Sequence, residues 1–322
     1  MYYSIKLVIK GLNLPFVQKH FIVDSPIPAF LFIMRTLKTT QGESQRLIHK
    51  GRVTANNEVL KSPGQIISGD ISVTVFEPEI VDMPPVFSTN DFMLFDKPSG
   101  ILVHPTTRHT PFSMLDAMRR YGGVESNPAH RIDRETSGLL LASKHKEAEV
   151  LIKSGFENRM IYKSYLAWVD GKITDSFEVN VPLQKNEDFG SIKHKVTVEK
   201  SGKLSHTSFV PIQYDPYLDS TLVQCFPHTG RMHQIRVHLF HVKHPILGDP
   251  IYGVPFEISN AYLDKVLSDK DRAIYTGASR LMLHAQSLDF SYNEVKYKIE
   301  SKIDFQGLKS LIAPKKARRF NT

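Results

Sequence analysis

The sequence has little cysteine and no long apolar run. Cys225 is its only cysteine among 322 residues, which excludes an intramolecular disulfide and a cysteine-based zinc site. Cys225 lies in an apolar stretch, residues 222–226, so we expect a buried small side chain rather than a reactive thiol. The longest apolar run, residues 27–34, is too short to span a bilayer. Because the first residues contain no signal-peptide core, we expect a cytoplasmic protein without membrane contact.

Several motifs of cofactor chemistry are also missing. The sequence contains no GxGxxG, GxxxxGK[ST] or GxSxG, so dinucleotide-dependent, nucleotide-dependent and serine-hydrolase functions have no basis in it. Histidines crowd one region, but HExxH is absent and no carboxylate follows at a metal-binding spacing. These histidines are His228, His233, His238, His241 and His244. We expect them to make hydrogen bonds or RNA contacts, and we expect neither a metal nor a cofactor.

Positive charge is in excess. The chain has 41 lysines and arginines against 33 aspartates and glutamates, a net charge of +8 and a pI of about 9.3. This excess favours a polyanionic partner, above all a nucleic acid.

The chain divides into segments of different composition. Residues 1–76 predict a small module, with strands over residues 3–9 and 70–76 and helices near residues 27–37 and 44–53. A proline-rich linker follows, residues 77–86, and consecutive prolines make it stiff and extended. Residues 87–305 form the main domain, and residues 306–322 form a basic tail that we expect to be mobile.

The clearest chemical signal lies at residues 130–144, HRIDRETSGLLLASK. The apolar half after Gly138 predicts a buried strand, with Asp133 in the loop just before it. Since Arg131 and Arg134 flank Asp133, we expect its carboxylate to stay ionised. An ionised carboxylate is a competent nucleophile at a sugar carbon, although a simple salt bridge would use the same residues.

Three further segments surround this signal. Residues 92–105 predict a strand, a turn and a second strand over residues 101–104. Residues 162–171 alternate so that Lys163 and Tyr165 share one face of a strand.

The third segment, residues 226–239, predicts a helix. Thr229 is a candidate N-cap residue, and the apolar stripe of this helix consists of Met232, Ile235 and Leu239. Arg236 projects beside the stripe, and a partly buried arginine needs an anionic partner.

Together these segments resemble the RluA-type family of RNA pseudouridine synthases. The family patterns HRLDRxTSG, DKPxGxxVHP, KxYxAxVxG, TGRxHQIRxHL and GDxxYG match residues 130–138, 96–105, 163–171, 229–239 and 248–253, with Ile132 in place of the usual leucine. The resemblance implies an α+β fold, in which a largely antiparallel mixed sheet carries a central cleft.

The resemblance also implies roles for single residues. The catalytic residues would be Asp133 as nucleophile, Tyr165 stacked on the target base, and Arg236 paired with the aspartate. Ile235 would pack on the other side of the base, and Arg131 would fill the gap left by the flipped nucleotide. His233 and Arg231, in TGRxHQIR, would complete the substrate-binding set.

The first segment resembles a small RNA-binding module shared with a ribosomal small-subunit protein. The match rests on residues 44–57 and 68–75. Arg46, Lys50 and Arg52 are the expected phosphate contacts. An ordinary solvated helix face would have a similar composition.

Several functions remain open on this basis. We expect a monomeric isomerase acting on structured RNA, with large-subunit ribosomal RNA favoured over tRNA. A non-catalytic RNA-binding or assembly factor would not need Asp133, Tyr165 and Arg236 together. A glycoside hydrolase would need a second carboxylate, and Glu135, the nearest, is expected to be a surface residue.

Overall fold

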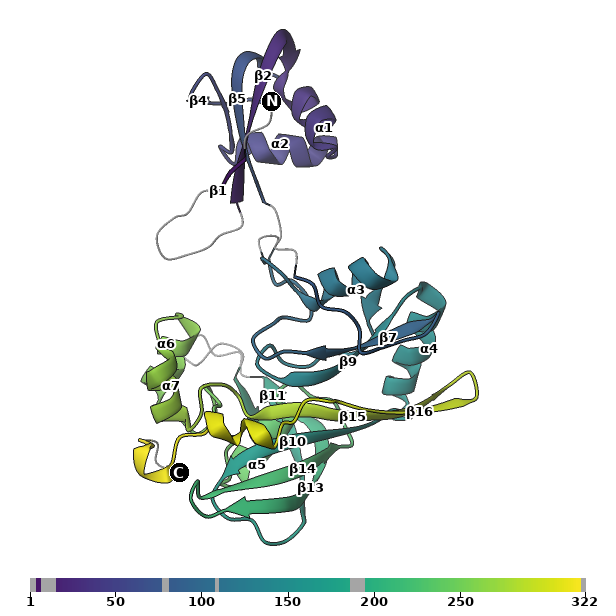
Figure 1. Ribbon diagram of the computed structural model, residues 1–322, viewed down its shortest axis with the longest axis vertical. Coiled ribbons are helices and arrows are strands. Elements are labelled where there is room, and N and C mark those ends of the chain that lie inside the picture. The colour runs from purple at the N-terminus through teal and green to yellow at the C-terminus, as the bar shows by residue number, and fades with distance from the viewer. Residues whose placement is uncertain (1–3, 7–15, 77–80, 108–109, 186–194, 320–322) are drawn as a thin grey trace. The chain divides into compact units, whose positions relative to one another are not determined.

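The computed structural model describes residues 4–6, 16–76, 81–107, 110–185 and 195–319 (Figure 1). The chain splits into two compact units. The smaller comprises Met1–Val81 with Pro105–Phe112, and the larger comprises Asp82–His104 with Ser113–Thr322. No helix among the described residues is both long and apolar enough to cross a membrane.

The smaller unit is an antiparallel sheet with two helices on one face (Figure 1). Its five strands lie in the order β1-β2-β5-β3-β4. They are β1 (Ser4–Lys6), β2 (Phe16–Pro28), β3 (Val53–Ala55), β4 (Glu58–Val59) and β5 (Ile66–Phe76), and the helices are α1 (Ala29–Leu37) and α2 (Gln41–His49).

Local sequence explains these helices. In α1, Ala29 and Ile33 are fully buried against the sheet. A capping box at the start of α2 joins Thr40 and Glu43, which satisfies the free amide groups of its first turn. Both helices and the strand that ends at Phe76 are confirmed, but the second helix covers Gln41–His49 rather than residues 44–53. The expected strand over residues 3–9 is described only as β1, its other residues lying outside the described part, and the long strand β2 was not anticipated.

The larger unit is built on an 11-stranded sheet in the order β12-β11-β13-β14-β10-β15-β9-β7-β6, with β16 paired to β15 and β8 paired to β9. The strands are β6 (Phe87–Ser88), β7 (Phe92–Lys97), β8 (Asn127–Pro128), β9 (Ser137–Ser143), β10 (Tyr162–Asp170), β11 (Phe177–Lys185), β12 (Val196–Val198), β13 (Lys203–Asp215), β14 (Ser220–Pro227), β15 (Leu283–Tyr292) and β16 (Val295–Glu300). The helices are α3 (Met114–Gly122), α4 (Lys146–Glu157), α5 (Gln234–His241), α6 (Phe256–Leu263) and α7 (Asp269–Thr276), followed by the 3-10 turns η1 (Gly307–Leu311) and η2 (Lys315–Ala317). The expected α+β class with a largely antiparallel mixed sheet is confirmed.

One parallel pair, β9 with β15, joins the two halves of this sheet. Ser137 is opposite His284, and Gly138 is opposite Ala285. Gly138 has a φ of +107°, and a Cβ there would lie 2.3 Å from the carbonyl oxygen of Ala285. Only glycine permits this approach, which seats the loop carrying Asp133 at the centre of the sheet.

The core lies on both sides of this junction. One cluster contains Trp168, Phe209 and Leu239, and another contains Phe92, Leu141 and Phe290. All seven residues of β9 are buried, which confirms the buried strand expected after Gly138. Cys225 is fully buried in the first cluster, as expected of a small apolar side chain.

Two expectations are wrong, one in the main domain and one in the basic tail. Residues 101–104 form no strand, because there only Leu102 makes a ladder contact, an isolated bridge to Ser113. The basic tail is not a free end over its described part. Arg318 is 2% exposed at its side chain and donates to Asp170 over 2.7 Å, so its charge is paired within the core.

Candidate active site

A cavity of about 1220 Å³ opens on the larger unit. Its walls come from the loop before β9, from the end of α4, from β10 and β13, from the end of β14, and from the start of α5. The seven residues that the sequence assigns to catalysis and substrate binding all line it: Arg131, Asp133, Tyr165, Arg231, His233, Ile235 and Arg236. The tertiary structure thus brings together residues from three separate sequence motifs.

Asp133 presents its carboxylate to this cavity. The side chain is 25% exposed, and its Oδ2 atom accepts a hydrogen bond of 3.0 Å from Nη1 of Arg236. Nε2 of His233 lies 3.8 Å from the same oxygen. Two nitrogen-bearing side chains from the start of α5 therefore face one carboxylate oxygen.

Arg236 is held by a second carboxylate. Its side chain is only 3% exposed, and its Nε and Nη2 atoms donate to the two oxygens of Asp249 over 2.7 and 2.8 Å. Asp249 is itself buried, and it accepts the backbone amides of Ile251 and Tyr252. Such a bidentate pair fixes the guanidinium plane and leaves Nη1 free to meet Asp133.

Asp249 was not identified as a site residue from the sequence. The signal was present, because Asp249 is the aspartate of the GDxxYG pattern. Tyr252 of the same pattern lies with its ring 5.1 Å from the Arg236 guanidinium carbon, and its hydroxyl is 2.9 Å from Nδ1 of His233. This pattern therefore serves to orient the residues that face Asp133.

The surroundings keep Asp133 ionised. Burial opposes its charge, but His233, Arg236 and Lys97 outweigh burial and hold the pKa of Asp133 below its usual value. The expected cause was different, namely the adjacent arginines. Arg134 instead donates to the carbonyl oxygen of Gly100, and Arg131 is exposed at the cavity wall.

Lys97 supports the loop that carries Asp133. Although it is fully buried, its amino group donates over 2.9 Å to three carbonyl oxygens, those of Pro98, Ile101 and Arg134. Burial lowers the pKa of Lys97 to about 7. The lysine ties the turn after β7 to the loop that carries Asp133.

Tyr165 lies on β10, between Cys225 of β14 and Ala285 of β15. Burial, and then the charge of Asp133, raises the pKa of Tyr165. Its hydroxyl therefore stays protonated across the physiological range. Ile235, 6% exposed, lines the same cavity from the first turn of α5.

The start of α5 differs from the expectation. His233, not Thr229, is the N-cap residue, and it has a left-handed backbone with φ of 56°. Thr229 donates to Gln234 over 2.6 Å and accepts the amide of His206. Met232 lies before the helix and is 42% exposed, so only Ile235 and Leu239 of the expected stripe are buried.

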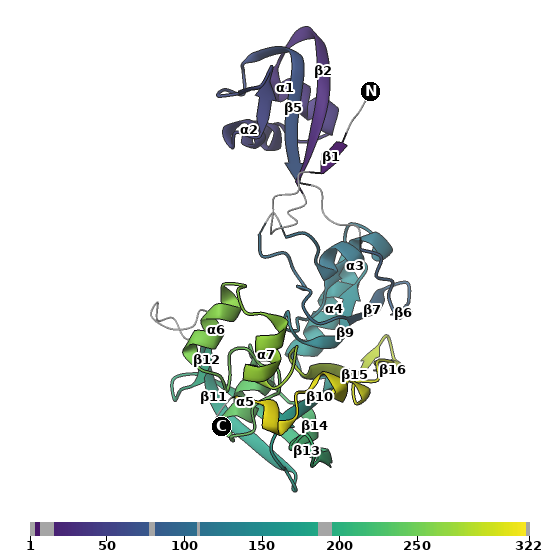
Figure 2. The ribbon, with the colours of Figure 1, turned by 60° about the vertical axis from the view of Figure 1, so that its left-hand side comes forward.

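The expected surface position of Glu135 is also wrong. Its side chain is 12% exposed, and it accepts 2.7 Å hydrogen bonds from Arg272 of α7 and Tyr262 of α6. These two helices lie side by side (Figure 2). Burial opposes its charge, but the Arg272 guanidinium and the Tyr262 hydroxyl hold the pKa of Glu135 below its usual value. Glu135 therefore anchors the loop next to Asp133.

The histidines that are close together in the sequence make contacts in different parts of the larger unit. His238 lies between the hydroxyls of Ser205 and Thr207, and Nδ1 of His244 lies 2.8 Å from the carbonyl oxygen of Asp170. His241 is exposed on α5. Their closeness in sequence therefore does not correspond to one common site.

The three basic residues expected to bind phosphates belong to the smaller unit. Arg46 is exposed on α2, Lys50 is the exposed C-cap residue of that helix, and half-buried Arg52 immediately precedes β3. They follow one another over one short stretch of chain.

The comparisons with known proteins all match pseudouridine synthases that act on RNA. A sequence model described as RNA pseudouridylate synthase matches residues 91–241. An uncharacterized RNA pseudouridine synthase of Helicobacter pylori is 35% identical over 289 residues, which cover 89% of this chain and 94% of that protein. Ribosomal large subunit pseudouridine synthase C of Vibrio vulnificus is 31% identical, covering 79% and 81%. The mitochondrial tRNA pseudouridine(32) synthase of Saccharomyces cerevisiae is 35% identical, covering 65% and 46%.

A solved structure shares the fold. Human RNA pseudouridylate synthase domain containing 1 superposes with a TM-score of 0.57 at 25% identity, covering 74% of this chain and 91% of that one.

Proposed function

We propose that this chain, which belongs to the RluA-type family of RNA pseudouridine synthases, modifies large-subunit ribosomal RNA with Asp133 as its nucleophile. The family membership makes it an isomerase acting on RNA. The observation that carries the catalytic assignment is the ionised Asp133 carboxylate, 3.0 Å from a buried arginine and open to a large cavity.

The reaction fits a site of this kind. Pseudouridine formation breaks the bond between N1 and C1′, turns the uracil, and joins C5 to C1′. The proton on C5 leaves and N1 gains one, so the product is an isomer and no oxidant or reductant is consumed. Asp133 acts on the nucleoside while Arg236 holds its carboxylate in place.

Tyr165 and Ile235 would bind the base. A uridine in a helix must be flipped out of its stack, at a cost of a few kcal/mol. Stacking on the Tyr165 ring would recover roughly 1–3 kcal/mol of that cost. Because the Tyr165 hydroxyl stays protonated, it would act near the base as a proton donor and not as a phenolate anion.

Three side chains at the cavity wall would contact the RNA strand. Arg131 and Arg231 are exposed there and carry positive charge toward the phosphates. His233, which lines the cavity between Tyr252 and Asp133, would complete this set.

Coverage by the relatives favours ribosomal RNA. Matches to the large-subunit enzymes cover 79% of this chain, which is a greater share of the chain than the larger unit makes up. Matches to the enzymes named for tRNA cover 65% and 61%, which is no more than the larger unit contains. The matches to the large-subunit enzymes therefore include at least part of the smaller unit, and Arg46, Lys50 and Arg52 are its proposed phosphate contacts.

The test is pseudouridine mapping in cells that lack this protein, followed by assays with purified protein on transcripts. We expect a site in large-subunit ribosomal RNA to lose its modification and a matching transcript to regain it. Loss confined to tRNA would overturn the substrate assignment and leave the reaction intact. Release of free uracil instead of a C-linked nucleoside would overturn the reaction.

A further inference from the structure

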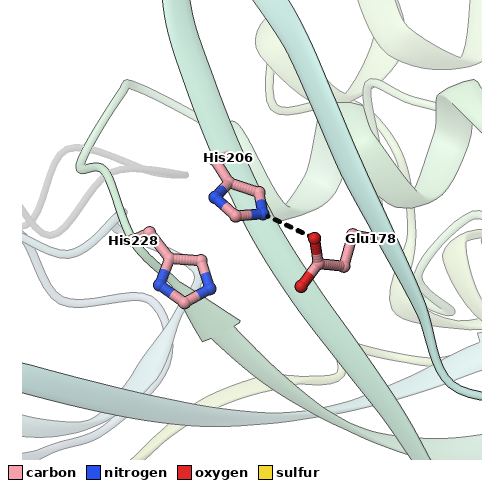
Figure 3. A group of neighbouring side chains, drawn as sticks. All are labelled: Glu178, His206 and His228. Carbon is pink, nitrogen blue, oxygen red and sulfur yellow. Dashed lines mark hydrogen bonds and ion pairs between the residues drawn. The ribbon is translucent and has the colours of Figure 1, made fainter.

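Three side chains, two of which line the cavity, form a group separate from the Asp133 loop. Glu178 lies on β11, His206 lies on β13, and His228 follows β14 (Figure 3). One nitrogen or oxygen from each lies within 4.8 Å of those from the other two. His206 and His228 line the cavity, and the Glu178 side chain is 65% exposed.

The strand register creates this group. Glu178 is opposite Ser208, and His206 lies two residues before Ser208 on the same face of β13. The backbone amide of His228 donates to the carbonyl oxygen of His206 over 3.0 Å, and the amide of His206 donates to Thr229 over 3.0 Å. The backbone positions of the two histidines are therefore linked to each other.

The side chains are also oriented. Nε2 of His206 lies 3.2 Å from Oε2 of Glu178. The hydroxyl of Ser208 donates to Oε1 of Glu178 over 2.9 Å and lies 2.8 Å from Nε2 of His228. The two imidazole rings stack with their centres 4.3 Å apart. Ser208 thus makes hydrogen bonds to Glu178 and His228, two of the three side chains.

We propose that Glu178, His206 and His228 bind one divalent transition-metal ion of the zinc class. Two imidazoles and one carboxylate form a ligand set that such ions prefer, whereas magnesium and calcium require mainly oxygen ligands. Ligands bonded to tetrahedral zinc at about 2.0–2.1 Å lie about 3.3 Å from each other. The 3.2 Å between His206 and Glu178 already meets this spacing, and the ligand atom of His228 lies within 4.8 Å of both.

The fourth position on the ion would face the cavity. Since His206 and His228 line the cavity, a water molecule or an RNA phosphate oxygen can reach an ion held between them. The ion and one glutamate together carry a single positive charge. The site would therefore add an attachment point for the RNA backbone without entering the isomerisation itself.

This site differs from the histidine group that the sequence singles out. It shares only His228 with that group, because Glu178 and His206 precede the group in the sequence. The reacting groups Asp133 and Arg236 are held by hydrogen bonds to protein atoms. We therefore expect pseudouridine formation to persist in EDTA even though the ion binds.

The experiment is calorimetric titration of EDTA-dialysed full-length protein with zinc chloride, repeated with cobalt chloride and followed by visible absorption. We expect one saturable site and the intense cobalt absorption of a four- or five-coordinate ion. Glu178→Gln, which keeps a hydrogen-bonding side chain, should weaken binding at least about tenfold, as should Ser208→Ala. The matched control is His241→Ala, which removes an exposed histidine outside the group and should bind as the unaltered protein does.

Circular dichroism of each variant shows whether it is folded. Absence of saturable binding by the unaltered protein would overturn the site, and so would equal affinity of the unaltered protein and Glu178→Gln. The titration contains no RNA, so its result is independent of the proposed substrate and mechanism.

Discussion

Arg236 places its Nη1 atom 3.0 Å from Oδ2 of Asp133, although 103 positions separate the two residues in the sequence. The arginine has lost almost all contact with water, and Asp249 holds its other two donor atoms. Asp133, the proposed nucleophile, thus faces a cation whose orientation is set beforehand. Catalysis benefits from such preorganisation because no group has to be reoriented during the reaction.

Replacing Asp133 by asparagine should abolish pseudouridine formation. The amide keeps the size of the side chain and can accept a hydrogen bond from Arg236, but it is no nucleophile. RNA affinity should change little, because phosphate contacts supply most of it. Single-turnover assays and binding measurements check both parts, and turnover near that of the unaltered protein would rule out the nucleophile assignment.

Tyr165→Phe should lose most turnover while binding RNA nearly as well as the unaltered enzyme. The ring can still stack on the base, but the protonated hydroxyl is gone. Removal of a positioned acid or base typically slows a reaction about 10²–10⁴-fold. If RNA binding collapsed instead while bound complexes reacted normally, Tyr165 would be a docking residue.

Asp249→Ala should destabilise the protein by about 3–5 kcal/mol, because it leaves the buried charge of Arg236 with a single partner. Urea denaturation measures the effect. The control is Asp289→Ala at an exposed position of β15, which should stay within about 0.5 kcal/mol. A loss no larger than that of the control would show that Asp249 does not support Arg236.

Glu135→Gln should reduce stability at neutral pH by about 1–3 kcal/mol, because Arg272 loses its charged partner. The pKa of Glu135 is lower in the folded than in the unfolded chain. The ion pair therefore stabilises fully above the ordinary glutamate pKa of about 4.3, and this stability is lost as pH falls through the folded value. Urea denaturation across pH should show the two proteins converging on the acid side.

The exposed Glu300→Gln serves as a control for that experiment and should behave as the unaltered protein at each pH. The free energies of unfolding of Glu135→Gln and of the unaltered protein should approach each other on acidification. If they moved apart instead, the assignment of the ion pair would be contradicted.

Replacing Arg46, Lys50 and Arg52 together by alanine should weaken RNA binding and its salt dependence. Each lost phosphate contact lowers the slope of log affinity against log salt by about 0.7–0.9. The single-turnover rate at saturating enzyme should change little, because Asp133 lies in the other unit. Binding across a salt series followed by kinetics separates the two effects.

The matched control removes the same amount of charge from other exposed positions of the smaller unit, Arg35, Lys38 and Lys61. Equal slopes for the two triple variants would show a general charge effect, and the proposed phosphate contacts would then be abandoned.

The sequence alone predicted seven of the residues that line the cavity and the class of the fold. Motif spacing placed Asp133 before a buried strand and Tyr165 on a strand face, since each depends only on a few neighbouring residues. It also indicated that Arg236 needs an anion, because a helix position beside an apolar stripe is buried whatever lies opposite.

The tertiary structure alone decided the partners. Arg236 reaches Asp133, and Arg272 reaches Glu135, from segments more than 100 positions away in the sequence, so no local pattern could reveal either pair. Glu178, His206 and His228 meet only through the register of neighbouring strands. The physical reason is that hydrogen bonds and ion pairs require contact within a few ångströms, and only the folded sheet brings such distant residues that close.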